Sequence, residues 1–222
     1  MAIFSDTFTV DADTTLASHT PDEGTGWTLL WQDGANPAFS ASATDDVCKA
    51  TSQNNSGVIY SACGVYPSAD YEVEFKLLDY NTFNTRPFFV LTRLQDPSNF
   101  YATKLVNAAA SSKLYKKVAG VFTQIGADFT GPAASSICKL EVIGTTLKFY
   151  DDGVVVASAT DSDISAAGKA GIGNGGGASL LLSTDDANAT ATFDDWVVTD
   201  LSGAAAGDGL TPGMLRPMGI IF

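Results

Sequence analysis

The fold is decided by residues 137–156, which read ICKLEVIGTTLKFYDDGVVV. From Cys138 to Val142, apolar residues alternate with charged ones, and this period of two indicates a strand with one buried face. The alternation returns after a turn at Gly144, and the Asp152-Gly153 pair that follows is a strong hairpin signal. The stretch therefore predicts three consecutive antiparallel strands.

Similar short segments run through the rest of the chain. The clearest is 71–78, YEVEFKLL, in which apolar residues alternate with Glu and Lys. Turns rich in Gly, Pro, Asn and Asp separate the segments, which gives about fourteen strands, and at most one short helical turn is expected, within 161–168. The expected fold is all-β, a two-sheet antiparallel sandwich. Further strands are expected at 4–8, 27–31, 39–43, 47–50, 58–62, 87–94, 100–106, 113–125 (a hairpin), 169–174, 179–185 and 193–201.

The motifs along the chain also carry a family resemblance. The three strands are followed by GKAGI at 168–172 and by FDDWVV at 193–198, and the opening half contains FSDTF at 4–8 and Gly26-Trp27. This pattern resembles concanavalin A-like lectin/glucanase (LamG-like jelly-roll) domains of the kind found in bacteriophage virion proteins, over roughly residues 3–201. The resemblance implies a jelly-roll sandwich. Because such domains also occur in carbohydrate-binding modules and glycan-active enzymes, it specifies the fold better than the function.

The composition describes a foldable, acidic chain. Of its 222 residues, 45% are hydrophobic and 17% charged, and the net charge is −13. Such a charge argues against nucleic acid or an anionic membrane as a direct partner. No run of about 20 apolar residues is present, so no membrane-spanning segment is expected.

The start of the chain and its three cysteines indicate in which cellular compartment the protein is assembled. Met1-Ala-Ile-Phe4 runs directly into the first expected strand, without a basic or apolar leader. This favours assembly in the host cytoplasm as part of a particle; the alternative is an extracellular place reached without a signal peptide. Reduced thiols are then the default, although Cys48 and Cys63 could pair across a hairpin. Cys138 is expected to be a small core residue.

The C-terminal residues differ in character from the rest. Residues 1–201 are expected to form the sandwich, 202–209 (SGAAAGDG) a linker, and 210–222 (LTPGMLRPMGIIF) an extended apolar tail broken by proline. We expect the tail to dock on a neighbouring subunit or partner protein; packing on its own sandwich is the alternative. The expected docking side chains are Leu210, Met214, Leu215, Met218, Ile220, Ile221 and Phe222.

No catalytic residue is predicted. His19 is the single histidine, and a loop residue without a nearby nucleophile fits no catalytic arrangement. Glu72 and Glu74 alternate outward on one strand, as on a solvated face. The glucanase pattern of carboxylates along one strand is missing, although a pair of distant carboxylates stays open among 25 acidic residues. The basic cluster Lys113, Lys116 and Lys117 could contact an acidic glycan or protect an edge strand.

Two kinds of binding site are considered. A first and a last strand lying side by side would bring Asp6 near Asp194 or Asp195, where oxygen ligands suit Ca²⁺, the one cofactor expected. The alternative is that these carboxylates cap strand ends and face water. Aromatic side chains on loops could stack on sugar rings, and ordinary packing is the alternative for each. The candidates are Trp31, Tyr66, Tyr80, Phe83 and Tyr150.

Three classes of function compete. The first is a non-enzymatic structural protein at the virion surface, as a capsid decoration protein or a tail or fibre subunit. It would be a homo-oligomer that contacts other virion subunits through the tail and could also contact host surface glycans. The second is a stand-alone carbohydrate-binding module. The third is a glycan-cleaving enzyme, for which the catalytic signature is missing.

Overall fold

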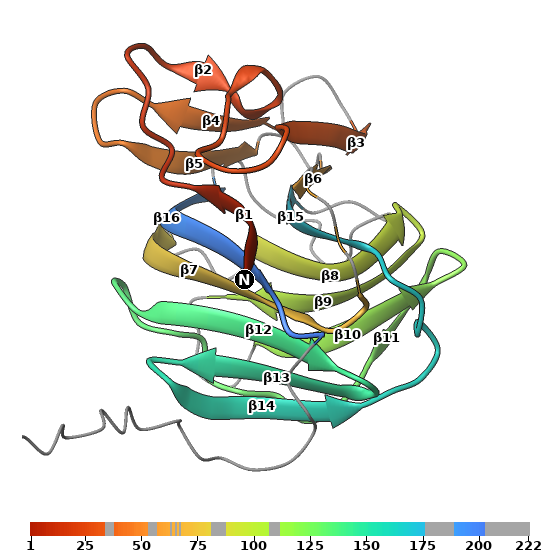
Figure 1. Ribbon diagram of the computed structural model, residues 1–222. Coiled ribbons are helices and arrows are strands. Elements are labelled where there is room, and N and C mark those ends of the chain that lie inside the picture. The colour runs from red at the N-terminus through yellow and green to blue at the C-terminus, as the bar shows by residue number, and fades with distance from the viewer. Residues whose placement is uncertain are drawn as a thin grey trace, which may run out of the picture.

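Two antiparallel sheets make up the computed structural model, which describes residues 1–33, 38–52, 57–62, 64, 66, 68–80, 88–106, 112–175 and 189–202 (Figure 1). The nine-stranded sheet has the order β14 (Val154–Thr160), β13 (Thr146–Asp151), β12 (Ile137–Ile143), β7 (Tyr71–Tyr80), β16 (Ala189–Asp200), β5 (Val47–Ser52), β4 (Ala38–Ser42) and β2 (Thr14–Thr15), and β1 (Ala2–Asp6) also pairs with β16. The seven-stranded sheet has the order β11 (Val121–Gln124), β10 (Lys113–Val118), β9 (Asn99–Leu105), β8 (Phe88–Asp96), β15 (Lys169–Gly175), β6 (Gly57–Ala62) and β3 (Trp27–Asp33).

The expected all-β, two-sheet sandwich is confirmed. β12, β13 and β14 are the three consecutive strands that the sequence predicts, and Asp152 and Gly153 turn the second hairpin with φ of 47° and 78°. The first strand ends at Asp6 rather than Phe8, because Phe8 has a φ of 53° that no strand accommodates.

The helical content differs from the expectation in a small way. Residues 161–168 form no helical turn, whereas a three-residue 3-10 helix, η1 (Leu16–Ser18), follows β2. In the described part of the chain, no helix has the length and apolar character that a bilayer crossing requires. The strand expected at 179–185, the tail at 210–222 and all but the first residue of the linker at 202–209 lie outside the described residues.

Aromatic rings fill the space between the sheets. The ring centroids of Phe88 and Phe193 lie 5.0 Å apart, and those of Phe75 and Trp196 lie 5.5 Å apart. All four side chains are buried, and they come from β7, β8 and β16, so they join the two sheets. Large buried rings of this kind supply much of the apolar area that stabilises a sandwich.

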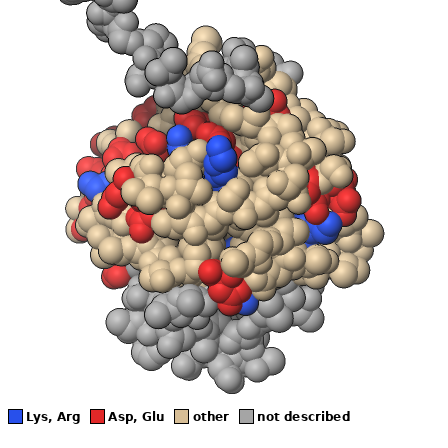
Figure 2. All heavy atoms as spheres, turned by 90° about the horizontal axis from the view of Figure 1, so that it is seen from below, with Lys and Arg blue, Asp and Glu red and all other residues tan. Residues whose placement is uncertain are grey.

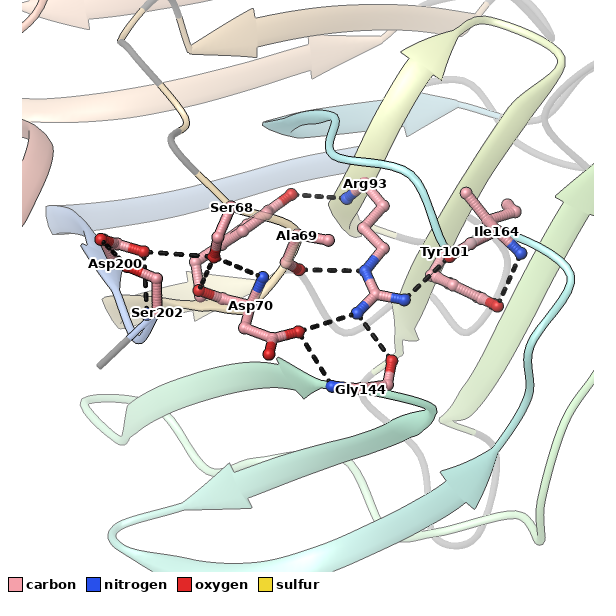
Figure 3. A network of polar contacts seen from close by, with 10 residues as sticks. Ser68, Ala69, Asp70, Arg93, Tyr101, Gly144, Ile164, Asp200 and Ser202 are labelled. Atoms are coloured by element: carbon pink, nitrogen blue, oxygen red, sulfur yellow. Dashed lines mark hydrogen bonds and ion pairs between the residues drawn. The ribbon is translucent and has the colours of Figure 1, made fainter. Parts of the chain in front are cut away.

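A buried arginine fastens the sheets at one end (Figure 3). The Arg93 side chain, from β8 of the seven-stranded sheet, donates from Nε to the carbonyl of Ala69 at 3.0 Å and from Nη1 to that of Ile164 at 2.8 Å. Its Nη2 donates to the Gly144 carbonyl at 2.7 Å and to Asp70 Oδ1 at 3.2 Å. Because Asp70 and Gly144 belong to the connections of the nine-stranded sheet, this network links both layers.

Two cysteines lie inside the sandwich. Cys48 and Cys138 are buried free thiols, as expected for Cys138. Cys63, the disulfide partner considered above for Cys48, lies outside the described residues. Burial raises the pKa of both thiols well above the ordinary value, which leaves almost no reactive thiolate.

Thiol labelling tests this arrangement. In a Cys63→Ser variant, neither remaining thiol should react with an aromatic disulfide reagent while the chain is folded, and both should react in concentrated guanidinium. Rapid labelling of the folded chain would contradict the burial of these residues.

Replacing Arg93 tests the link between the sheets. Arg93→Met should lower the free energy of unfolding by about 3 kcal/mol or more, because Asp70 and several carbonyls lose their buried donor. Equilibrium urea unfolding gives the value. Lys148→Met is the control: Lys148 is 39% exposed and 3.6 Å from Glu141, so its loss should cost less than about 0.5 kcal/mol. Equal losses in the two variants would contradict the role given to Arg93.

Candidate functional site

The seven-stranded sheet is apolar on both of its faces. Along β8, Phe88 and Val90 point into the space between the sheets, whereas Phe89 and Leu91 belong to a second apolar cluster on the outward side. An outward sheet surface is normally polar. The second cluster contains Ile59, Phe89, Leu91, Leu94, Phe100 and Ala102, with half-buried Leu30, Trp31 and Phe122 packed against it.

We call this outward side the outer apolar face. It consists of the second cluster together with the outward side chains of β9 and β10, which are Lys104, Lys113, Tyr115 and Lys117. The strand register places one row of residues straight across six strands of the face. The row reads Trp31, Ile59, Gly173, Phe89, Lys104 and Lys113. Trp31 and Lys104 thus lie about 19 Å apart, four strand spacings, on one surface.

Aromatic rings and a lysine meet at the β9–β11 side of the face. The Phe122 centroid lies 5.7 Å from that of Phe100 and 6.1 Å from that of Tyr115. Lys117 Nζ lies over the Phe122 ring, 4.8 Å from its centroid, and 5.6 Å from that of Phe100. Burial lowers the pKa of Lys117, and the cation–π contacts favour its charged form.

The other two lysines of the face differ in their partners. Lys113 Nζ donates to both carboxylate oxygens of Asp128, at 2.9 and 2.8 Å, and to Gln124 at 3.1 Å. Lys104 is half-buried and makes no ion pair or hydrogen bond through its ammonium with any residue that the structure describes. Burial, with the nearby charge of Lys113, lowers the pKa of Lys104, and the charge of the Asp128 carboxylate opposes this shift.

The expected basic cluster is therefore divided. Lys113 and Lys117 lie on the outer apolar face, but Lys116 points to the opposite side and pairs with Asp161 at 2.5 Å and Asp163 at 2.6 Å. The edge-strand interpretation was wrong, because β10 lies between β9 and β11, and β11 forms this edge of the sheet.

The aromatic candidates do not form one site. Trp31 lies half-buried on the outer apolar face. Tyr66 packs on the core, 5.3 Å from the Tyr71 ring, and its hydroxyl donates to the Ala62 carbonyl at 3.1 Å. Phe83 and the side chain of Tyr80 lie outside the described residues.

Tyr150 lies on the nine-stranded sheet, on its outward side. Its hydroxyl donates to Glu141 at 3.1 Å, and Lys139 Nζ lies 4.5 Å from the ring centroid while pairing with Glu72 at 2.9 Å. Burial and the Glu141 carboxylate raise the pKa of Tyr150 to about 12. The polar groups around this ring are thus satisfied by one another.

Asp6 and His19 belong to a buried cluster. Asp6 is 1% exposed and accepts from Trp27 Nε1 at 2.6 Å and from the Phe8 backbone N–H at 2.8 Å. His19 Nε2 lies 2.7 Å from Asp6 Oδ1 and is itself buried, so the histidine joins its loop to the core rather than organising an exposed turn. The pair resembles a catalytic dyad in distance, but it is enclosed.

The calcium candidates occupy different surroundings. β1 and β16 lie side by side as expected, with Asp6 opposite Trp196, yet both Asp6 oxygens are engaged in the buried cluster. Asp195 is exposed, and its backbone N–H donates to Asp194 Oδ1 at 2.8 Å. Within the described ranges, no three His, Cys, Asp or Glu side chains are grouped as metal ligands. The Ca²⁺ site stays a prediction.

Several residues of the outer apolar face were missed in the sequence. Phe89, Lys104, Tyr115 and Phe122 were assigned to strands without a role. The signal was present in the run Phe-Phe-Val-Leu at 88–91, because a strand with four consecutive apolar residues is buried on both sides.

Comparisons with known proteins bear on the fold. The carbohydrate-binding module CBM66 from Bacillus subtilis matches with a TM-score of 0.58 at 20% identity, over 79% of this chain and 96% of that chain. A Bacillus subtilis protein of unknown function with a galectin-like fold gives 0.57 at 13% identity, over 84% and 93%. LamAcat from Zobellia galactanivorans gives 0.57 at 10% identity, over 89% and 97%.

These likenesses establish the architecture. The chain has the two-sheet jelly-roll fold of these proteins, which confirms the jelly-roll part of the resemblance drawn from its motifs; its phage context stays a prediction. No protein-family model matches the sequence, and no curated protein matches it. At such low identities the likeness extends to the fold alone.

The buried carboxyl of Asp6 predicts the direction in which the stability of the folded chain changes with pH. Burial raises the pKa of Asp6, although hydrogen bonds from Trp27 and His19 oppose the shift. The folded chain therefore holds the proton more tightly than the unfolded chain, and this stabilisation is lost as the pH rises through the folded pKa. The stability advantage of the wild type over Asp6→Asn should narrow as the pH is raised from about 3.5, just below the unfolded value.

Urea unfolding of both proteins across this pH range gives the difference in stability, from which the contributions of groups that do not contact Asp6 cancel. An advantage that widens with rising pH would contradict the prediction. It would mean that the ion pair with His19 outweighs the cost of burying the charge.

Proposed function

We propose that the chain is a non-enzymatic glycan-binding module that binds at the partly exposed aromatic side chains of the outer apolar face, Trp31 and Phe122. The six cluster residues are buried, at 0–2% exposure, so the proposal rests on the aromatic side chains that pack against the cluster and stay partly exposed. Sugar rings stack on aromatic faces while their hydroxyl groups bond to polar neighbours. Trp31 and Phe122 are aromatic side chains of this face that keep partial exposure.

Two further observations support a binding role over catalysis. CBM66, which shares the fold, is a carbohydrate-binding module. Glu72, Glu141 and Asp128 each pair with a lysine, so none of these three carboxylates is free for catalysis. Hydrolysis by two carboxylates requires one of them to be a free acid beside the scissile bond.

A place on a virion remains a separate prediction. It rests on the resemblance of the motifs to phage domains and on the apolar tail at 210–222, which lies outside the described residues. None of the three solved structures above is described as a virion protein. A homo-oligomer assembled through the tail belongs to the same prediction, and it is compatible with glycan binding.

Substitutions on opposite sheets test the binding surface. Trp31→Ala should weaken binding of the best glycan from an array by about tenfold, roughly 1.4 kcal/mol, because a stacking ring is lost. Isothermal titration of wild type and variant gives the value. Tyr150→Ala is the matched control, since this ring lies on the nine-stranded sheet, and its affinity should stay within about twofold of wild type.

A larger loss in Tyr150→Ala than in Trp31→Ala would move the site to the other sheet. If no glycan binds to the wild type on the array, the glycan-binding function itself is wrong.

A further inference from the structure

Polar side chains gather beside Phe122, one of the two partly exposed rings of the outer apolar face. Gln124 lies two residues further along β11 and directly opposite Tyr115 on β10. Lys113 lies two residues before Tyr115 on the same side of β10, and its side chain is 25% exposed. Asp128 follows β11 and its side chain is 38% exposed. A small-molecule site combines an apolar surface with a few placed polar groups, and both are present here.

The hydroxyl of Tyr115 is the donor of this group. The side chain is 6% exposed, but its oxygen is not sealed from solvent, and it makes no hydrogen bond with a described residue. The charges of Lys113 and Asp128 both act on it, so it lies near their ion pair. Burial raises the pKa of Tyr115, and the hydroxyl therefore keeps its proton. Because a tyrosine hydroxyl in such a position usually has a partner, this one is available to a ligand.

The carboxylate of Asp128 is the acceptor. Its Oδ1 accepts from Lys113 at 2.9 Å and from Gln124 Nε2 at 2.7 Å. Lys113, at 2.8 Å, is the one described residue that donates to Oδ2. A carboxylate oxygen has two lone pairs, so Oδ2 can accept one more hydrogen bond. The hydrogen bonds from Lys113 and Gln124 lower the pKa of Asp128, which keeps this acceptor charged at neutral pH.

The ammonium groups nearby are engaged within the protein. Lys113 Nζ makes three hydrogen bonds, two to Asp128 and one to Gln124, which match its three donors. Lys117 lies over the Phe122 ring, and the charge of Asp128 also acts on Lys104. On the side of the molecule shown in Figure 2, basic side chains likewise lie next to acidic ones. One donor and one acceptor, close together, are therefore presented to a ligand.

We infer that a sugar is recognised beside Phe122 through two hydroxyl groups on neighbouring ring carbons, one accepting from Tyr115 and the other donating to Asp128 Oδ2. The inference rests on the proposed glycan-binding function and names the part of the glycan that is recognised. A hydroxyl both donates and accepts, so two adjacent hydroxyls satisfy a donor and an acceptor that lie side by side. A carboxylate or sulfate in place of the second hydroxyl would lie against the charge of Asp128.

The experiment maps the recognised hydroxyls with deoxy sugars. The probes are the methyl glycosides of glucose, galactose and mannose, each with the monodeoxy derivatives that lack one hydroxyl in turn. For the glycoside that binds best, removal of two hydroxyls on adjacent carbons should weaken binding to wild type. The expected losses are about fivefold at the position bonded to Tyr115 and about tenfold or more at the position bonded to Asp128, because the second bond is charge-assisted.

Two variants assign each hydroxyl to its partner. Tyr115→Phe should bind the parent glycoside about fivefold more weakly and should no longer respond to removal of the first hydroxyl. Asp128→Asn should lose most of its response to removal of the second. The melting temperature of ligand-free Tyr115→Phe should equal that of wild type, whereas a structural role for this hydroxyl would lower it.

Matched controls lie on the nine-stranded sheet. Tyr150→Phe removes a hydroxyl that bonds to Glu141, and Asp45→Asn removes the charge of another exposed aspartate paired with a lysine, Lys49. Both variants should respond to the deoxy sugars as wild type does.

The outcomes separate the inference from the function on which it rests. If the sensitive hydroxyls are not adjacent, if either variant keeps its full response, or if the array shows a glycan ligand while no glycoside binds, the inference is wrong and the glycan-binding function stands. If neither a glycoside nor any glycan of the array binds, both are wrong. Two adjacent hydroxyls, one coupled to Tyr115 and the other to Asp128, would establish the inference.

Discussion

The bulge at Arg93 is the constraint on which the rest of the sandwich depends. Arg93 has a φ of 47°, and the register of β8 shifts at this point against both β9 and β15. Side chains alternate with a period of two, so a slip by one residue would exchange Phe88 with Phe89 and the inner face with the outer one. The guanidinium is held by carbonyls and a carboxylate of the opposite layer, which prevents the slip. Gly168 permits this contact, because a Cβ there would lie 2.5 Å from the Arg93 carbonyl carbon.

The register of β8 therefore determines which side chains face the inner core and which belong to the outer apolar face. The inner side chains stabilise the sandwich by burying aromatic surface between the sheets. The outer side chains of the same strands form a second buried apolar cluster on the other side of the seven-stranded sheet.

Much of the fold could be predicted from the sequence, and little of the site. Alternation and the Asp152-Gly153 turn identify the β12–β14 strands because local pattern and turn chemistry agree. The Arg93 network joins residues as much as 71 positions apart, so no local pattern indicates it. Lys104 looks like any outward lysine of an alternating strand, and the like charge of Lys113 lies opposite it only in the folded sheet. The burial of His19 could not be predicted for the same reason, because its partner Asp6 lies on a different element.

The pairing of β1 with β16 has a consequence for how the module is displayed. The Met1 ammonium lies 3.4 Å from the carbonyl oxygen of Asp200, so the two ends of the sandwich meet in the nine-stranded sheet (Figure 1). Anything attached at either end is joined to the sheet that does not carry the outer apolar face. Several copies tethered to one scaffold through these ends would present the seven-stranded sheet on the side away from the attachment, and weak individual contacts there would combine into strong multivalent attachment.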